Sequence, residues 1–454
     1  MAQRVDVHSH VFNGGYLPLA GILQQKFGVP KWTAIAVEFL IHDRMGKGVV
    51  DCSRQAGSGA NVLSADVLAD LSELEEEDLI DLILGPPDLT ASAAEPDFED
   101  ELDEAAWTNF ASGGGVSALG AGDVWKRLLR LLAELVDTGK ALLRWLAVLV
   151  SHECDVAAGL HNTIHGVDLY VHHMMDMANH YPGVPYYAFW DEQIDRMRSL
   201  AQQPGAKLVG FVAFDPRRED GVEKVEEALK SGFAGVKFYP PNGYRPIDNV
   251  GNAEFDQRCN DVFDLCCDLK SPLFSHCTEF GFEARPGYGR FSDPLGWKKV
   301  LISHPDLRLC LGHAGGASDW LGQSLGPYAR TVVELCETYD NVYCEMGHFE
   351  EIIDRDRHLV LRNRLHQMIQ MYPDLKNKVM FGSDWHVMAL GEYDVDKYIA
   401  SFEKVFEGPL ASMKQAFFGE NAIKYLNLAA FETNSAGALS PQESEMIRQL
   451  QGNV

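Results

Sequence analysis

Short apolar runs alternate with amphipathic stretches over most of the chain. Seven runs rich in β-branched and aromatic residues recur at 167–172, 207–214, 234–239, 272–276, 308–313, 341–345 and 378–382. Each is followed by a polar or Gly/Pro-rich loop and then by residues with the apolar period of a helix, which is typical of strands alternating with helices. An eighth run, residues 4–10, stands at the start of the chain.

The spacing of these runs predicts the kind of sheet. After residue 167 their starts lie 27 to 40 residues apart, which is the length of one strand and one helix. Strands that are apolar throughout and separated by helices are typical of parallel sheets covered on both faces. A count of eight favours a closed (β/α)₈ TIM barrel, and an open doubly wound sheet stays the alternative. We therefore predict an α/β fold of the TIM-barrel type.

One interval is far longer than the others, since about 160 residues separate the first two runs. Within it, 66–84 and 116–150 have helical patterns, and the acidic, Gly- and Pro-containing residues between them are typical of a loop. We predict a large, mainly helical insertion between the first and second barrel strands, with an acidic, partly flexible segment. The predicted units are a barrel domain at 1–16 and 166–430, a helical cap at 17–165 and a tail helix at 431–454.

The charge balance restricts the partners of the protein. The 454 residues contain 66 Asp and Glu against 39 Lys and Arg, a formal net charge of −27. Seventeen of the acidic residues fall in 55–125, a segment without Lys or Arg. Binding to nucleic acid or to an anionic membrane needs clustered basic residues, so we expect neither. The expected partner is a small-molecule substrate, and a homo-oligomer is left open.

Targeting and cysteine patterns indicate a cytoplasmic protein. The first residues lack the basic start and long apolar stretch of a secretory signal. The most apolar stretch, 141–150, is interrupted by Arg144 and is too short to span a bilayer. Nine cysteines at irregular positions fit reduced thiols better than a disulfide framework.

Residues suited to binding a metal stand at the end of the first predicted strand. His8 and His10 are two positions apart, and alternate residues of a strand point to the same side. Both imidazoles are therefore expected to project into the mouth of the barrel, where they could hold one metal ion.

The ends of later strands carry further residues of this type, namely Lys237, His276, His313 and Asp384. In a TIM barrel the carboxyl ends of the strands meet at one rim, where catalytic groups converge. His and carboxylate ligands suit zinc, and manganese or iron(II) is the alternative. The sequence therefore predicts a divalent metal site at this rim.

The order of these residues resembles the amidohydrolase superfamily of metal-dependent barrel enzymes. Four segments, 235–241, 312–316, 382–385 and 419–422, are similar to its amidohydrolase-2 branch, which contains hydrolases and related decarboxylases. The resemblance covers 1–12 and 167 to about 428, whereas 17–165 departs from the common pattern.

The resemblance implies roles for particular residues. His8, His10, His276 and Asp384 match metal-ligand positions, and Asp384 also accepts the proton of the attacking water. His313 matches a position that is a second-metal ligand in some members and a catalytic acid or base in others.

Lys237 is the ambiguous residue. In binuclear relatives a lysine at this position is carboxylated and bridges two ions, whereas in this branch it is often a plain lysine near the site. Because a bare ammonium repels a second cation, one metal is favoured over two, and Lys237 then faces the substrate or a neighbouring carboxylate.

Several other residues are candidates for binding substrate. Tyr239 and Arg245 lie on the loop after the fourth strand, where a guanidinium could hold a carboxylate. His386 comes two residues after Asp384. Further candidates are Arg285, Glu345 and His348, while the adjacent His172 and His173 are read as packed or solvent-facing residues.

These observations favour a metal-dependent hydrolase, in which activated water attacks an ester, lactone or amide-like bond of a small organic substrate. The alternative is a metal-dependent non-oxidative decarboxylase of a small unsaturated or aromatic acid, because the same residues serve both reactions. A third hypothesis is a non-catalytic binding protein built on the barrel, which the completeness of the ligand set disfavours.

Overall fold

Eight parallel strands form the centre of the protein in a computed structural model. The structure describes residues 3–45, 71, 73–84, 121–136, 138–179, 181–182, 190–391 and 395–452. The strands pair in chain order and are β1(Val5–Ser9), β2(Leu169–His173), β3(Leu208–Phe214), β4(Phe233–Phe238), β5(Leu273–His276), β6(Leu309–Gly312), β7(Val342–Glu345) and β8(Val379–Met380). Each coincides with one of the eight predicted runs, so the predicted barrel is confirmed.

The residues after β8 join the last strand to the first. Val7 N–H donates to the carbonyl of Phe381 at 3.2 Å, and Asp384 N–H donates to the carbonyl of His8 at 2.7 Å. Ser9 and Trp385 form a parallel bridge between the same segments. The sheet therefore closes, and the open-sheet alternative is wrong.

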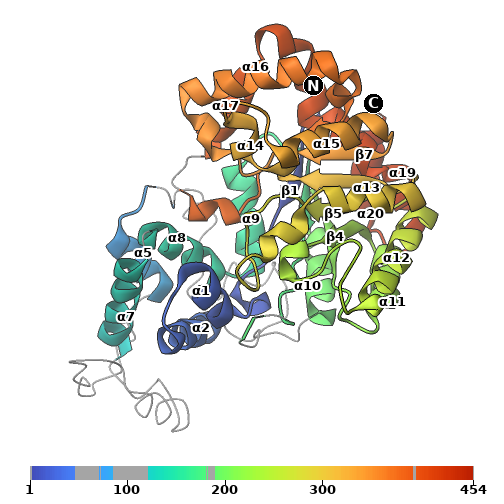
Figure 1. Ribbon diagram of the computed structural model, residues 1–454. Helices are drawn as coiled ribbons and strands as arrows, with labels where there is room; N and C mark the ends of the chain where they lie inside the picture. Colours follow the sequence, from blue (N-terminus) through green and yellow to red (C-terminus); the bar gives the residue numbers. More distant parts are fainter. Residues whose placement is uncertain are drawn as a thin grey trace.

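Helices cover the outside of the barrel (Figure 1). They are α10(Asp191–Ala201), α11(Gly221–Lys230), α12(Ala253–Asp268), α13(Leu295–Ser303), α14(Ala317–Leu321), α15(Pro327–Thr338), α16(Arg355–Met371), α17(Val395–Val405) and α18(Asn421–Leu426). All eight strands are buried along their whole length, as expected for a parallel sheet between helical layers.

The C-terminal helices pack against the inner barrel residues. They are α19(Leu428–Asn434) and α20(Pro441–Gln451), and α20 begins at a capping box in which Ser440 accepts from Glu443 N–H. Phe431 and Ile447 share an apolar cluster with Val5 and Phe274 of the strands. This cluster fills the barrel interior, because inward-facing strand residues need apolar partners.

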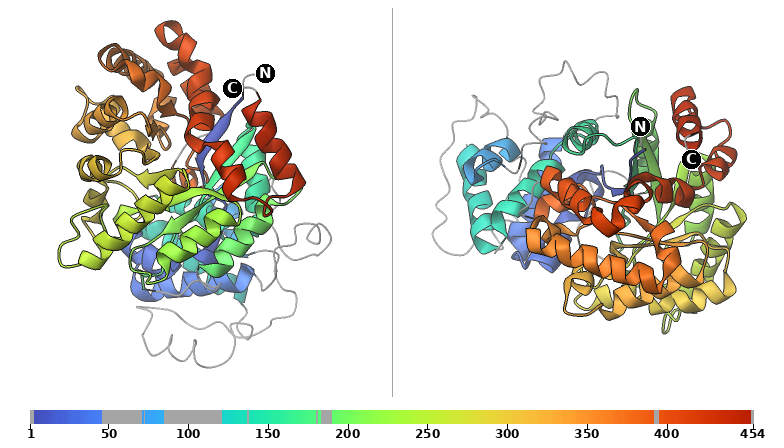
Figure 2. Two further views of the ribbon diagram at one scale, coloured as in Figure 1. Left: turned by 90° about the vertical axis from the view of Figure 1, so that its right-hand side faces the viewer. Right: turned by 90° about the horizontal axis from the view of Figure 1, so that it is seen from above.

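Six described helices lie between β1 and β2, a region that we call the β1–β2 segment. They are α1(Leu19–Phe27), α2(Lys31–Met45), α5(Glu76–Leu84), α7(Ala121–Leu135), α8(Gly139–Leu149) and α9(Glu153–Thr163). Helices α1, α2, α5, α7 and α8 gather on one side of the barrel (Figures 1 and 2). The predicted acidic loop at 85–115 lies outside the described residues, and the division into separate domains stays a prediction.

The cysteines differ in part from the expectation of reduced thiols. Seven described cysteines are free, but Cys154 on α9 is disulfide-bonded. The expectation is therefore wrong at Cys154, because irregular spacing says nothing about which residues the fold brings together. Among the described helices, none is long and apolar enough to cross a membrane.

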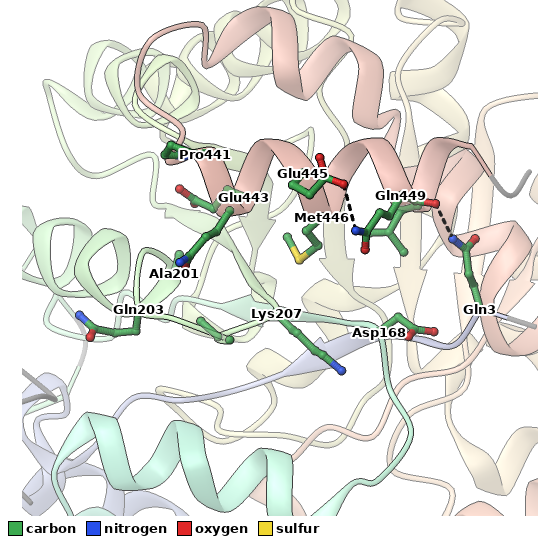
Figure 3. A pocket seen from close by; sticks show the side chains of 14 residues that line it. Gln3, Asp168, Ala201, Gln203, Lys207, Pro441, Glu443, Glu445, Met446 and Gln449 are labelled. Carbon is green, nitrogen blue, oxygen red and sulfur yellow. Dashed lines mark hydrogen bonds between the residues drawn. The ribbon is translucent and has the colours of Figure 1, made fainter. Parts of the chain in front are cut away.

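A cavity of about 580 Å³ lies at the amino ends of β1, β2 and β3. Gln3, Asp168 and Lys207, which precede these strands, line it together with residues of α20 (Figure 3). A hydrogen bond from Gln3 Nε2 to the carbonyl of Gln449, 3.1 Å long, lies at one end of it. In barrel enzymes this rim serves stability and the opposite rim serves catalysis.

Candidate active site

A second cavity, of about 460 Å³, opens at the carboxyl ends of the strands. Its polar lining includes His8, His10, Lys237, Tyr239, His276, Thr278, His313, His348 and Asp384. Its apolar lining includes Phe12, Phe27, Met175, Met177, Phe280, Phe282, Val387 and Leu390. Six of the residues predicted from the strand ends therefore meet in one cavity with an apolar wall.

Two predicted metal-ligand histidines converge on one carboxylate oxygen of a third predicted ligand, Asp384. Oδ1 of Asp384 lies 3.2 Å from Nε2 of His8 and 3.2 Å from Nε2 of His10. All three side chains are buried, and their ligand-type atoms lie within 4.8 Å of one another. Burial acts to raise the pKa of Asp384, but the surrounding histidines, His348 among them, outweigh it and hold this pKa well below its usual range.

The Nδ1 atoms of His8 and His10 contact oxygen atoms of other residues. Nδ1 of His10 lies 2.8 Å from the carbonyl oxygen of His173, and Nδ1 of His8 lies 3.3 Å from Oε2 of Glu345. A carbonyl or carboxylate partner places the proton on Nδ1 and leaves Nε2 as a lone-pair donor. Burial and the Lys237 charge hold the pKa of His8 well below its usual range, which keeps the ring neutral. This donor set fits a divalent metal ion.

Glu345 at the end of β7 contacts two of the predicted site residues. It is fully buried, and its Oε2 accepts from the backbone N–H of His313 at 3.0 Å while facing His8. A Cβ atom at Gly347 or Gly382 would come within 2.1 Å of Oε1, so only glycine fits there. The sequence marks Glu345 as a rim residue that could bind substrate, and no pattern in it points to the contact with His8.

His276 and His313 face each other beside this group. Nδ1 of His276 lies 3.1 Å from Nε2 of His313, while their outer nitrogens lie 2.6 Å from the carbonyl of Phe280 and 3.1 Å from that of Gly347. When both rings donate outward to these carbonyls, the two facing nitrogens are both acceptors. A cation near this pair would relieve their repulsion. Burial lowers the pKa of His313 to about 4.

His276 differs from the other three predicted ligands. Its Nδ1 faces Nε2 of His313 and its Nε2 faces the carbonyl of Phe280. The described groups of converging ligand atoms are His8 with His10 and Asp384, and His8 with His313 and Glu345. A role for His276 as a metal ligand stays a prediction.

Lys237 of β4 lies in direct contact with the ligand set. Its Nζ is 3.2 Å from Nε2 of His8 and 4.4 Å from the centre of the Phe274 ring. Burial lowers the pKa of Lys237 to about 8, although the charge of Asp384 acts to raise it. The ammonium therefore competes with a metal ion for the same nitrogen of His8.

Three site residues that follow strands have left-handed backbone conformations. The φ angles are 60° at His313, 58° at His348 and 60° at Asp384. Such angles are uncommon outside glycine and cluster at functional sites, where the surrounding structure enforces them. At Asp384 the backbone hydrogen bond to His8 fixes the conformation.

The predicted substrate-binding residues differ in whether they line the cavity. Tyr239 lines the cavity, and its Oη accepts from Phe282 N–H at 2.8 Å. His386 is fully buried behind the site with Nε2 2.8 Å from the carbonyl of Phe12, and Arg245 stacks on the Phe291 ring at 4.5 Å. Neither His386 nor Arg245 is among the described residues that line the cavity.

His348 and the pair after β2 occupy other positions. Nδ1 of His348 lies 3.4 Å from Oδ2 of Asp384, on the cavity side. His172 and His173 are packed, and they contact the backbone of Val11 and Val7. His348 is one of the further substrate-binding candidates predicted from the sequence, but spacing alone does not predict its contact with Asp384.

A closed barrel with His8, His10 and Asp384 at its catalytic rim defines the class of metal-dependent barrel enzymes. Residues 173–428 match the family model Amidohydro_2, described as amidohydrolase. Because the match spans more than half of the chain, the protein belongs to this amidohydrolase family. His8 and His10 lie before the matched residues, and a comparison with curated proteins gives no match.

Several solved structures are similar at low identity. A "probable 2-pyrone-4,6-dicarboxylic acid hydrolase" of Acinetobacter baumannii with bound citric acid is 12% identical, covers 57% of this chain and 84% of its own, and has a TM-score of 0.41. A zinc-bound amidohydrolase of Burkholderia multivorans is 15% identical, covers 57% of this chain and 83% of its own, and has a TM-score of 0.41. A manganese-bound 5-carboxyvanillate decarboxylase of Novosphingobium aromaticivorans is 13% identical, covers 71% of this chain and 87% of its own, and has a TM-score of 0.42. These similarities carry no information on the substrate.

Proposed function

We propose that the protein is a metal-dependent hydrolase of a small, mainly apolar ester, lactone or amide-like substrate. The convergence of His8 and His10 on Oδ1 of Asp384, at 3.2 Å each, supports this proposal. We also propose that one ion is bound, because Lys237 occupies the space beside His8 where a second cation would meet an ammonium. Zinc is the preferred ion, with manganese or iron(II) as alternatives.

His8, His10 and Asp384 would hold the metal, and His276 is the proposed fourth ligand. A bound divalent ion supplies an activated water and polarises the substrate oxygen. Asp384 is placed to take the proton of the attacking water, since one of its oxygens faces the histidine pair and the other faces His348. His313, neutral because its pKa is lowered, would hold or return a proton at the leaving group.

The cavity wall supports an uncharged substrate. Four phenylalanine and two methionine side chains form an apolar part of the lining. The described lining contains no arginine; its basic side chains are Lys26 and Lys237, and its acidic groups other than Asp384 are Glu350 and Glu351. A neutral apolar group fits the phenylalanine and methionine part of the wall, because a charged group placed against these side chains would be desolvated without a partner.

Decarboxylation is the second candidate, and Lys237 is the observation that favours it. A buried ammonium beside the metal ligands could pair with the carboxylate of a small aromatic acid. The apolar wall would then receive the aromatic ring.

Isotope labelling separates the two reactions. The zinc- or manganese-loaded protein is given dihydrocoumarin, 4-nitrophenyl acetate or a set of hydroxybenzoic acids in ¹⁸O-water. We expect ¹⁸O in the carboxylate product of an ester or lactone, and no product from a His8→Ala/His10→Ala variant. Release of CO₂ from an aromatic acid without ester or lactone turnover would contradict hydrolysis and support decarboxylation.

A further inference from the structure

Helix α8 of the β1–β2 segment is buried against the loops that form the cavity. All its residues except Lys140 are buried. Arg144 and Trp145 stand next to each other on this helix, and adjacent residues of an α-helix project about 100° apart. The two side chains can therefore contact two different loops.

Arg144 holds the loop that follows β8. Its Nη2 donates to the carbonyl of Gly391 and its Nε to that of Ala389, 3.4 Å away. These carbonyls lie at the end of a 3₁₀ helix, Val387–Leu390, where helix carbonyls lack partners within the helix and attract a cation. Val387, Leu390 and Gly391 all line the cavity.

Trp145 supports the loop that follows β5. Its ring stacks on Phe282 at 5.4 Å with an interplanar angle of 22°, and it lies 6.4 Å from the ring of Phe27. Phe27 and Phe282 line the cavity, and the N–H of Phe282 donates to Tyr239. Trp145 thus backs the apolar wall at a point tied to the site.

We propose that Arg144 and Trp145 of α8 determine substrate selectivity by fixing the two loops that form the apolar wall. This inference deepens the proposed function, on which it rests, by assigning the wall to the uncharged apolar group of the substrate. Arg144 acts through Val387 and Leu390, and is a positioning residue. Its guanidinium bridges two carbonyls, a geometry that the single ammonium of lysine reproduces only in part.

Two metal-binding inhibitors with one shared head group test the proposal. Acetohydroxamate and benzohydroxamate differ in the apolar group alone, so the ratio of their dissociation constants measures the contribution of the wall. We expect Arg144→Met to lower the preference for benzohydroxamate about 10-fold, the order associated with one lost apolar contact. Metal content should be unchanged, Arg144→Lys should recover part of the preference, and Trp145→Leu should lower it as well.

Arg130 of α7 offers a matched control in the same segment. Its guanidinium forms an exposed pair with Glu77, with two hydrogen bonds of 2.7 Å. Arg130→Met should keep the wild-type preference. An equal loss of preference in the Arg130 and Arg144 variants, or a loss of metal in Arg144→Met, would overturn the proposal.

Hydrogen exchange gives a readout that does not depend on the reaction or on the metal. The amides of Ala389 and Gly391 bond to the carbonyls of His386 and Met388 at 2.9 Å each. Arg144→Met should speed exchange over residues 386–391 relative to Arg130→Met. Unchanged exchange would overturn the inference. If neither hydroxamate binds the wild type, the proposed metal chemistry fails while the exchange result still decides the role of Arg144.

Discussion

The backbone N–H of Asp384 donates to the carbonyl of His8 at 2.7 Å, while the side chains of the same residues approach to 3.2 Å. This backbone contact is one of those that close the barrel, and it brings two predicted metal ligands together. The left-handed conformation of Asp384, at φ 60°, turns its carboxylate toward both histidines. The contacts that close the barrel therefore also bring His8 and Asp384 together in the site.

Replacing Asp384 by asparagine should separate binding from chemistry. The amide keeps the shape but cannot take a proton, so we expect kcat to fall by about 10²-fold or more, with weaker metal binding. Steady-state kinetics and metal analysis at saturating metal measure the two effects. Asp155→Asn, which removes a carboxylate on α9 outside the cavity, is the control. Wild-type kcat in Asp384→Asn would exclude Asp384 as the base.

Replacing Glu345 by glutamine should weaken the metal site while keeping the fold. The amide oxygen can replace Oε2, which faces both His313 N–H and Nδ1 of His8, but as a neutral acceptor it polarises the His8 ring less than a carboxylate does. We expect metal affinity to fall by about 10- to 100-fold, as for other partners of metal-bound histidine. Competition with a chelator measures it, with Glu350→Gln as the control at the same cavity. Equal affinity in Glu345→Gln and wild type would refute this role.

The free energy of unfolding should depend on pH in part through the ionisation of Asp155. Partial burial and the neighbouring Glu153 raise the pKa of Asp155 from 3.8 to about 6. The folded state therefore binds more protons than the unfolded state between these values, and this group lowers stability as pH rises through that window. Asp155→Asn should raise the melting temperature more at pH 7.5 than at pH 4. A larger gain at pH 4 would reverse the assigned sign.

The eight strands could be predicted from the sequence because each is apolar throughout and followed by a helix. His8, His10, Lys237, His276, His313 and Asp384 could be placed at one rim for the same reason, since the carboxyl ends of parallel strands meet there. The contact of Glu345 with His8 and the reach of Arg144 to Gly391 could not, because both depend on side-chain packing between distant segments. Arg245 and His386 have suitable chemistry and spacing, but the fold directs them away from the cavity lining.

Metal content per chain tests the central claim most directly. Protein purified without chelator and reconstituted with zinc or manganese is measured by elemental analysis, beside the His8→Ala/His10→Ala variant and an Arg130→Met control. We predict one equivalent per chain in the wild type and the control, and none in the double variant. Absence of metal from reconstituted wild type, or full metal content without His8 and His10, would contradict the proposed site.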